Sequence, residues 1–260
     1  MSTSPVQAPL TRDSTVPMYV AETTGAPATP GARNTVGGWP VLPAGEPWPL
    51  CFCGTRMILF FQFDIPADIA VFGGDHLLVF QCPTHNDAVV AKGAPDKLPP
   101  GFWDTPPPLY TAPGAFWRIM RHRDDTSPAP APDEYLRPRQ LDFRPASEEV
   151  KIWWPEDVLS DGQDLDSAFT DHGTGLREFK IGGVPSWIQG RESYTCPCGH
   201  NLVYVCQLPT DTGFDKHHDR PEQLDTFRFG QYGLFLGNET YVLACPSHCH
   251  PAAAWPVNQN

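Results

Sequence analysis

The chain has 260 residues, of which 40% are apolar and 31 are proline, and its formal net charge is −12. So apolar and aromatic a composition excludes disorder along the whole length, and the abundant proline disfavours long helices because proline lacks the backbone N–H. The acidic charge argues against binding to nucleic acid or to a membrane, since phosphate backbones and anionic lipids attract basic surfaces.

Residues 1–33 are rich in Thr, Ala and Pro. We expect them to form an N-terminal extension that is either partly disordered or a strap over the body. They carry no basic segment followed by an apolar one, so no secretory signal is predicted. The chain also has no apolar run of about 18 residues that would span a membrane. We therefore expect a soluble, cytoplasmic protein.

A first repeat is predicted over residues 34–91. It contains the string GGWPVLPAGEPWPLCFCGTRMILFFQ, which begins at Gly37, and the string GGDHLLVFQCPTHND, which begins at Gly73. Within it, residues 57–63 and 77–81 are short apolar runs bounded by Gly, Pro and Cys. Such runs are typical of buried β-strands.

A proline-rich connection follows over residues 92–177. Its prolines cannot donate regularly to a β-ladder, so irregular or polyproline-like structure is expected. Side chains such as Trp103, Phe116 and Trp117 are too apolar for a free linker, and the connection should pack on the body. Short helices are predicted within it at residues 155–160 and 165–172.

The second repeat is predicted over residues 178–260. The string GGVPSWIQGRESYTCPCGHNLVYVCQ follows the first at an offset of 145 residues, and LGNETYVLACPSHCH follows its counterpart at 163. Strands are predicted at residues 202–208 and 241–244, and a helical turn at 251–255. Eight ungapped identities support a duplication: Gly37/Gly182, Gly38/Gly183, Pro40/Pro185, Gly45/Gly190, Cys51/Cys196, Cys53/Cys198, Gly54/Gly199 and Gln62/Gln207.

These elements predict a strand-dominated α+β fold, in which two duplicated Cys-bearing β units pack together. If the two strands of each unit pair antiparallel, the cysteines before the first strand lie beside those after the second. Each unit would then gather one cluster of ligands at the mouth of its strand pair. The first cluster is Cys51, Cys53, Cys82 and His85. The second is Cys196, Cys198, Cys245 and either His248 or Cys249.

Four thiolate and imidazole ligands suit tetrahedral Zn²⁺, so the sequence predicts two structural zinc sites. Repeat symmetry slightly favours His248 over Cys249 as the fourth ligand of the second site. The alternative is that reduced cysteines fill small gaps in the core, and disulfides are the least expected outcome in a reducing compartment. Cys206 replaces Phe61 inside a strand and is expected in the core, whereas His200, His217, His218 and His250 follow no ligand pattern.

The sequence contains no familiar catalytic motif. It has no HExxH or zinc-deaminase pattern, no GxSxG elbow and no Walker A loop. Each Gly-Gly pair is followed by x-Pro and not by a helix, which favours a tight turn over a phosphate cradle. No catalytic residues and no cofactor other than zinc are predicted.

The string KIGGVPSWIQ, the CxCG step and YVLACPSHC together resemble the YwqG-like bacterial family, whose function is unknown. The first half, with GGWPVLP and MILFFQFDIP, is similar to the other signature of that family. The same order resembles the programmed-cell-death-protein-2-like family of zinc-knuckle chaperones, which hold a newly made ribosomal protein but use CxxC pairs. The resemblance covers about residues 35–86 and 178–259, and it implies a duplicated α+β fold without established catalytic residues.

Two classes of function follow. The first is a zinc-stabilised protein- or peptide-binding module, chaperone-like or immunity-like, whose expected client is basic and meets aromatics such as Trp39, Trp48, Trp187 and Trp153–Trp154. The alternative is a metal-dependent or other hydrolase with an unrecognised site between the repeats. A cleft there with a His or carboxylate of shifted pKa would favour the hydrolase. The sequence leaves the client and the oligomeric state open.

Overall fold

The computed structural model describes residues 15–93, 96–123, 126–129, 131–133, 135–149, 176–224 and 228–260. Strands dominate these ranges, as the sequence predicts, and their helical structure is the 3₁₀ element η1 (Leu234–Gly237). The helices predicted at residues 155–160 and 165–172 lie outside the described residues. The helical turn predicted at 251–255 is wrong, because strand β14 begins at Ala254.

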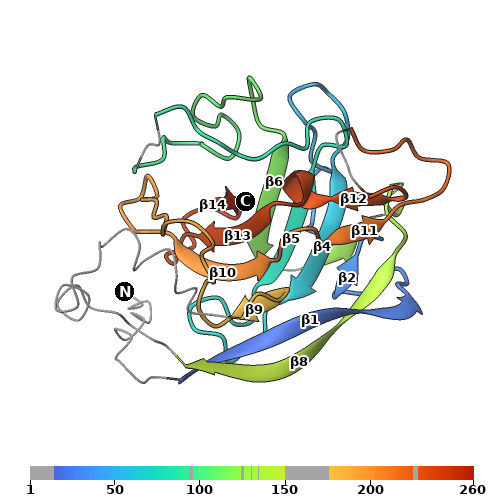
Figure 1. Ribbon diagram of the computed structural model, residues 1–260, viewed down its shortest axis with the longest axis horizontal. Coiled ribbons are helices and arrows are strands. Elements are labelled where there is room, and N and C mark those ends of the chain that lie inside the picture. Colours follow the sequence, from blue (N-terminus) through green and yellow to red (C-terminus); the bar gives the residue numbers. More distant parts are fainter. Residues whose placement is uncertain are drawn as a thin grey trace.

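Ten strands form one sheet, in the order β14–β13–β10–β9–β1–β8–β2–β4–β5–β6 (Figure 1). Every neighbouring pair in it is antiparallel. Its strands are β1 (Thr15–Pro27), β2 (Thr35–Val36), β4 (Ile58–Asp64), β5 (His76–Gln81), β6 (Trp117–His122), β8 (Arg139–Glu149), β9 (Lys180–Gly182), β10 (Val203–Leu208), β13 (Glu239–Ala244) and β14 (Ala254–Gln259). Two small ribbons pair β3 (Val41–Pro43) with β7 (Thr126–Pro128), and β11 (Gly213–Asp215) with β12 (Gln231–Gly233).

The sheet consists of two equivalent units on either side of a long central pair. The first unit is β2, β4, β5 and β6, the second is β9, β10, β13 and β14, and β1 and β8 lie between them. The ladder shifts between Leu59 and Phe61 in β4 and between Tyr204 and Cys206 in β10, which are equivalent positions at the offset of 145. The duplication seen in the sequence is therefore also present in the strand pairing.

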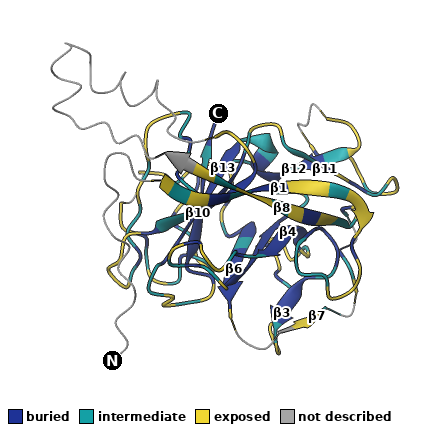
Figure 2. Cartoon of the chain, turned by 90° about the horizontal axis from the view of Figure 1, so that it is seen from below, coloured by how far each residue is buried: buried dark blue, intermediate teal, exposed yellow. Residues whose placement is uncertain are grey.

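The core strands are buried along most of their length. All six residues of β5 and of β13 are buried, as continuous apolar runs predict for strands covered on both faces. Loop residues of the proline-rich connection, such as Leu98, Phe102 and Phe116, join this same core. By contrast, the β1–β8 pair presents many exposed residues (Figure 2). Residues 15–27 of the N-terminal segment form β1, which lies between β9 and β8 at the centre of the strand order.

The two edge strands, β6 and β14, face each other, so the sheet is nearly closed. We call this place the seam. The rings of Trp117 and Trp255 meet there edge to face at 5.5 Å, and the Arg121 N–H donates to the Pro251 carbonyl at 2.9 Å. Within the described ranges no helix has the length and apolar character needed to cross a bilayer.

Candidate metal centres

The structure gathers cysteine and histidine side chains into two clusters. In each, the potential ligand atoms lie within 4.8 Å of one another. The first cluster is Cys51, Cys53, Cys82 and His85, and the second is Cys196, Cys198, Cys245 and Cys249. The first cluster lies at the start of β4 and the second at the start of β10. Every neighbouring pair between these two strands is antiparallel, so β4 and β10 run in opposite directions. The two clusters therefore lie at opposite ends of the sheet.

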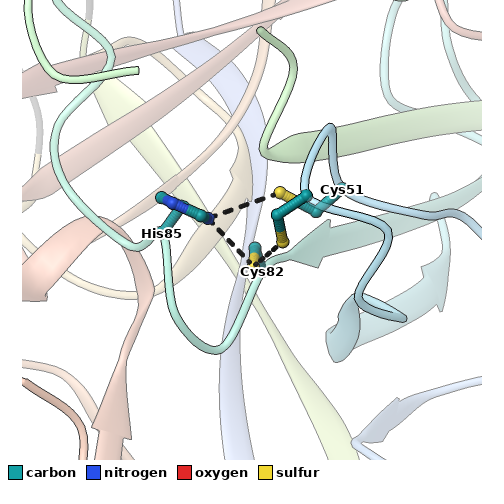
Figure 3. A group of neighbouring side chains, drawn as sticks. Cys51, Cys82 and His85 are labelled. Carbon is teal, nitrogen blue, oxygen red and sulfur yellow. Dashed lines mark hydrogen bonds between the residues drawn. The ribbon is translucent and has the colours of Figure 1, made fainter. Parts of the chain in front are cut away.

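Strand register explains the first cluster. Ile58 at the start of β4 pairs with Gln81 at the end of β5, so the residues before β4 lie beside Cys82. His85 points back from the following loop towards the sulfurs (Figure 3). Its Nδ1 lies 3.6 Å from Sγ of Cys51 and 3.6 Å from Sγ of Cys82, and the Sγ atoms of Cys53 and Cys82 are 3.9 Å apart.

The second cluster repeats this arrangement with four sulfurs. Val203 at the start of β10 pairs with Ala244 at the end of β13, which places the CxC step beside Cys245. The Sγ atoms of Cys196 and Cys249 are 3.4 Å apart, as are those of Cys198 and Cys245. Cys245 and Cys249 are 3.5 Å apart.

These distances are close to those expected between ligands of a single ion. Tetrahedral bonds of about 2.3 Å to sulfur and about 2.0 Å to nitrogen separate two sulfurs by about 3.8 Å, and sulfur from nitrogen by about 3.5 Å. A disulfide would require sulfurs about 2.05 Å apart, and all eight cysteines are free. Each cluster could therefore hold a metal ion.

A tight turn presents each CxC step. The Cys51 N–H donates to the Thr55 carbonyl at 2.9 Å, and the Cys196 N–H donates to the His200 carbonyl at 2.8 Å. The turn passes through Gly54 with φ of 82° and through Gly199 with φ of 96°, a left-handed conformation that favours glycine. The glycine after each CxC is thus required by the turn that points two sulfurs in one direction.

The two cysteines of each step differ in acidity. Burial raises the pKa of the Cys51 and Cys196 thiols. Burial also tends to raise the pKa of Cys53 and Cys198, but at these two residues hydrogen bonds that stabilise the thiolate lower the pKa by more. Contacts with Thr55 lower the pKa of Cys53 to about 6, and contacts with Ser247 and His200 lower that of Cys198 to about 5. The second cysteine of each step is therefore readily a thiolate, the form that binds metal.

The fourth position of the second cluster belongs to Cys249 and not to His248, which repeat symmetry favoured. His248 adopts a left-handed backbone conformation with φ of 50°, and its Nε2 lies 2.8 Å from Oδ2 of Asp75 in the first unit. The imidazole is thus engaged across the seam, and the next residue supplies the sulfur.

Two neighbours of the second cluster were not predicted. His200 was expected on a loop without a role, yet its Nδ1 lies 3.6 Å from Sγ of Cys198. The Ser247 hydroxyl lies 3.1 Å from Sγ of Cys245 and 3.4 Å from Sγ of Cys198. In the sequence, His200 directly follows the CxCG step and Ser247 lies within CPSHC, and no other feature of the sequence indicates that they approach the cluster. Cys206, expected in the core, is buried in β10 and outside both clusters.

The aromatic residues expected at a contact surface are half-buried. The Arg56 guanidinium lies 3.4 Å over the Trp48 ring, and Trp187 packs on Tyr241 at 4.3 Å. Trp39 is also half-buried, and Trp153–Trp154 lie outside the described residues. Other apolar side chains are exposed, among them Leu50 at 60% and Phe52 at 41%, which flank Cys51.

Two surface cavities are present in the described residues, and the smaller one lies beside the turn of the first cluster. One of about 340 Å³ is lined by Arg137, Asp215, Lys216, His218, Glu222 and Gly230. Another of about 140 Å³ is lined by Thr55, Arg56, Met57, Asp133 and Tyr135. Neither is lined by a cysteine or histidine of the two clusters.

Comparison with known proteins finds no matching family model and no match among curated proteins.

Proposed function

We propose that this chain is a zinc-stabilised binding module, with one structural Zn²⁺ in each cluster and a surface that binds a protein or peptide. The observation that carries the metal proposal is the convergence of four sulfur or nitrogen ligands in two equivalent places. Thiolates are soft ligands that select zinc over hard cations such as Mg²⁺. Cys₃His and Cys₄ are the ligand sets of structural zinc.

A structural role fits these sites better than a catalytic one. Catalytic zinc sites keep a position open for water, whereas both clusters supply four protein ligands. The ligands also come from loops at the ends of paired strands, so a bound ion would tie together the ends of β4 and β5 and those of β10 and β13. Because the unfolded chain has no preformed site, the free energy of metal binding would stabilise the fold.

The turn that carries Cys51 and Cys53 presents exposed apolar side chains that a client could contact. Leu50 and Phe52 flank Cys51 and are exposed, and the Phe52 ring lies against His85 at 4.5 Å. In the second unit the equivalent residues are Thr195 and Pro197, so the apolar display is specific to the first site. The net charge of −12 favours basic partners. We therefore propose a client with basic and apolar side chains, in agreement with the resemblance to zinc-knuckle chaperones.

A binding experiment tests this. A synthetic peptide that alternates Lys with Leu and Phe is compared with polylysine of equal charge, at low salt and at about 0.5 M salt, where screening is stronger. The mixed peptide should bind more tightly than polylysine and weaken with salt. Phe52→Ser should reduce its binding without loss of metal, whereas Phe229→Ser, which alters an exposed residue before β12, should not. Equal binding of both peptides, or binding that ignores salt, would refute the client proposal.

A further inference from the structure

Each metal cluster is followed by a loop that crosses the seam to the other unit. The first metal loop, residues 82–89, reaches β14, where the Val89 N–H donates to Oδ1 of Asn258 at 2.7 Å. The second metal loop, residues 245–251, reaches β6, where the Pro251 carbonyl accepts from the Arg121 N–H at 2.9 Å. The seam is therefore bridged from both sides by loops that begin at a metal ligand.

The second loop is held by buried charges. Asp75 of the first unit is fully buried, and its carboxylate accepts from Arg121 Nη1 at 3.1 Å and contacts His248 Nε2 at 2.8 Å. Arg123 Nε also donates to Asp75. Arg121 Nη2 donates to the carbonyl of Cys245, itself a member of the second cluster, at 3.1 Å. Moving this loop would leave the buried Asp75 and Arg121 with fewer partners, which is costly.

The backbone conformation at His248 also contributes to the position of the second metal loop. Its φ of 50° lies in the left-handed region, which residues with a side chain rarely adopt, although Asn, Asp and His are found there more often than others. It is flanked by Cys245 and Cys249, whose sulfurs meet in the second cluster, and its imidazole meets Asp75. An ion bound to both cysteines would hold the loop in the conformation that presents His248 to Asp75.

We propose that the second metal site is a latch for the seam. The metal holds residues 245–251 against Asp75 and Arg121, and this contact keeps β6 and β14 together. The proposal rests on the proposed metal binding and adds that His248 and Asp75 are positioning residues for the metal. Coupling between two equilibria is reciprocal, so breaking the latch must weaken metal binding, and removing the metal must loosen the seam.

The decisive variant is His248→Asn, because Asn tolerates the left-handed backbone but is too short to reach Asp75. Zinc-loaded full-length chain is mixed with a chromogenic chelator, and hydrogen exchange is measured for residues 117–122 and 254–259. We expect release of one of the two ions to speed up about tenfold, the size typical of lost outer-shell contacts, with faster exchange in both strands. Asn258→Ala, which cuts the bond of the first loop, is the comparison variant and should speed release of that ion much less than His248→Asn does.

Asp75→Asn provides a second variant, and the pair forms a double-mutant cycle. Both act through one contact, so the double variant should release the ion little faster than either single variant. Unchanged release and exchange in His248→Asn, or fully additive effects in the double variant, would overturn the latch. A protein that carries no metal would instead refute the proposed metal binding, so the two failures are distinguishable.

Discussion

Gln62 and Gln207 show how a single side chain fixes the start of each unit. Both are fully buried. Oε1 of Gln62 accepts from the Val41 N–H at 2.8 Å, and Oε1 of Gln207 accepts from the Ser186 N–H at 3.0 Å, again at the offset of 145. Each glutamine thus joins its strand to the segment that follows the Gly-Gly turn, which explains why this residue recurs in both repeats.

Replacement of Gln62 by Met should therefore destabilise the fold although size is nearly conserved. Met cannot pair with the Val41 N–H or with the Trp39 carbonyl, which accepts from Gln62 Nε2 at 2.7 Å. Buried groups left without partners cost about 1–3 kcal/mol each. Denaturant unfolding measures the loss, and Gln140→Met on exposed β8 serves as the control. Equal stability of the two variants would show that the Gln62 hydrogen bonds contribute little.

Seven of the eight cysteines belong to the two clusters, and Cys206 lies in the core. Cys53→Ser and Cys198→Ser should each reduce the metal content by one ion per chain and lower the free energy of unfolding, because the metal stabilises only the folded state. Cys206→Ala should cost about 1 kcal/mol through a small cavity and leave metal content unchanged. Elemental analysis with thermal unfolding distinguishes them. Loss of an ion in Cys206→Ala, but not in Cys198→Ser, would contradict the assignment.

The sequence predicts most members of both clusters, because the CxC and CPxH steps recur in order. It does not predict the choice between His248 and Cys249. In the structure His248 contacts Asp75, which is 173 residues away in the sequence, and the next residue, Cys249, completes the cluster. His200 and Ser247 likewise gain their roles from a turn geometry that spacing alone does not reveal.

At the scale of elements, the Gly-Gly turn of the second unit is tightly packed. Gly182 has φ of 71°, and a Cβ there would lie 2.4 Å from Cδ1 of Ile69 and 3.0 Å from the Pro17 carbonyl oxygen. Gly182→Ala should cost at least about 1–2 kcal/mol from the backbone conformation alone. Gly25→Ala in β1, where nothing lies within 4 Å, should have a much smaller effect. Similar melting temperatures for the two variants would rule out this role of Gly182.

Strands with continuous apolar runs were predictable, and those with mixed composition were not. Predicted residues 57–63 and 202–208 nearly coincide with β4 and β10. The strands β1 and β8 were missed because they mix polar residues with apolar ones and with proline, and they pair with each other over a long register. β14 was missed because it contains Pro256, which is tolerated at an edge strand but resembles a turn signal.

At the scale of the whole molecule, two equivalent units share one nearly closed sheet. Their clusters lie at opposite ends, and their loops cross the same seam. If both clusters hold zinc, each ion supports a different end of the sheet, and the ions together oppose its opening. Two such ions would help a chain so rich in proline and loops to maintain a single core.

The most direct test of this account is the metal content of the folded protein. Chain purified without chelator should carry close to two zinc ions by elemental analysis. Native mass spectrometry should show both on the same molecule, and only Cys206 should lie outside the metal-bound cysteines. Protein that contains no metal, with all eight cysteines freely titratable in the folded state, would contradict the central claim.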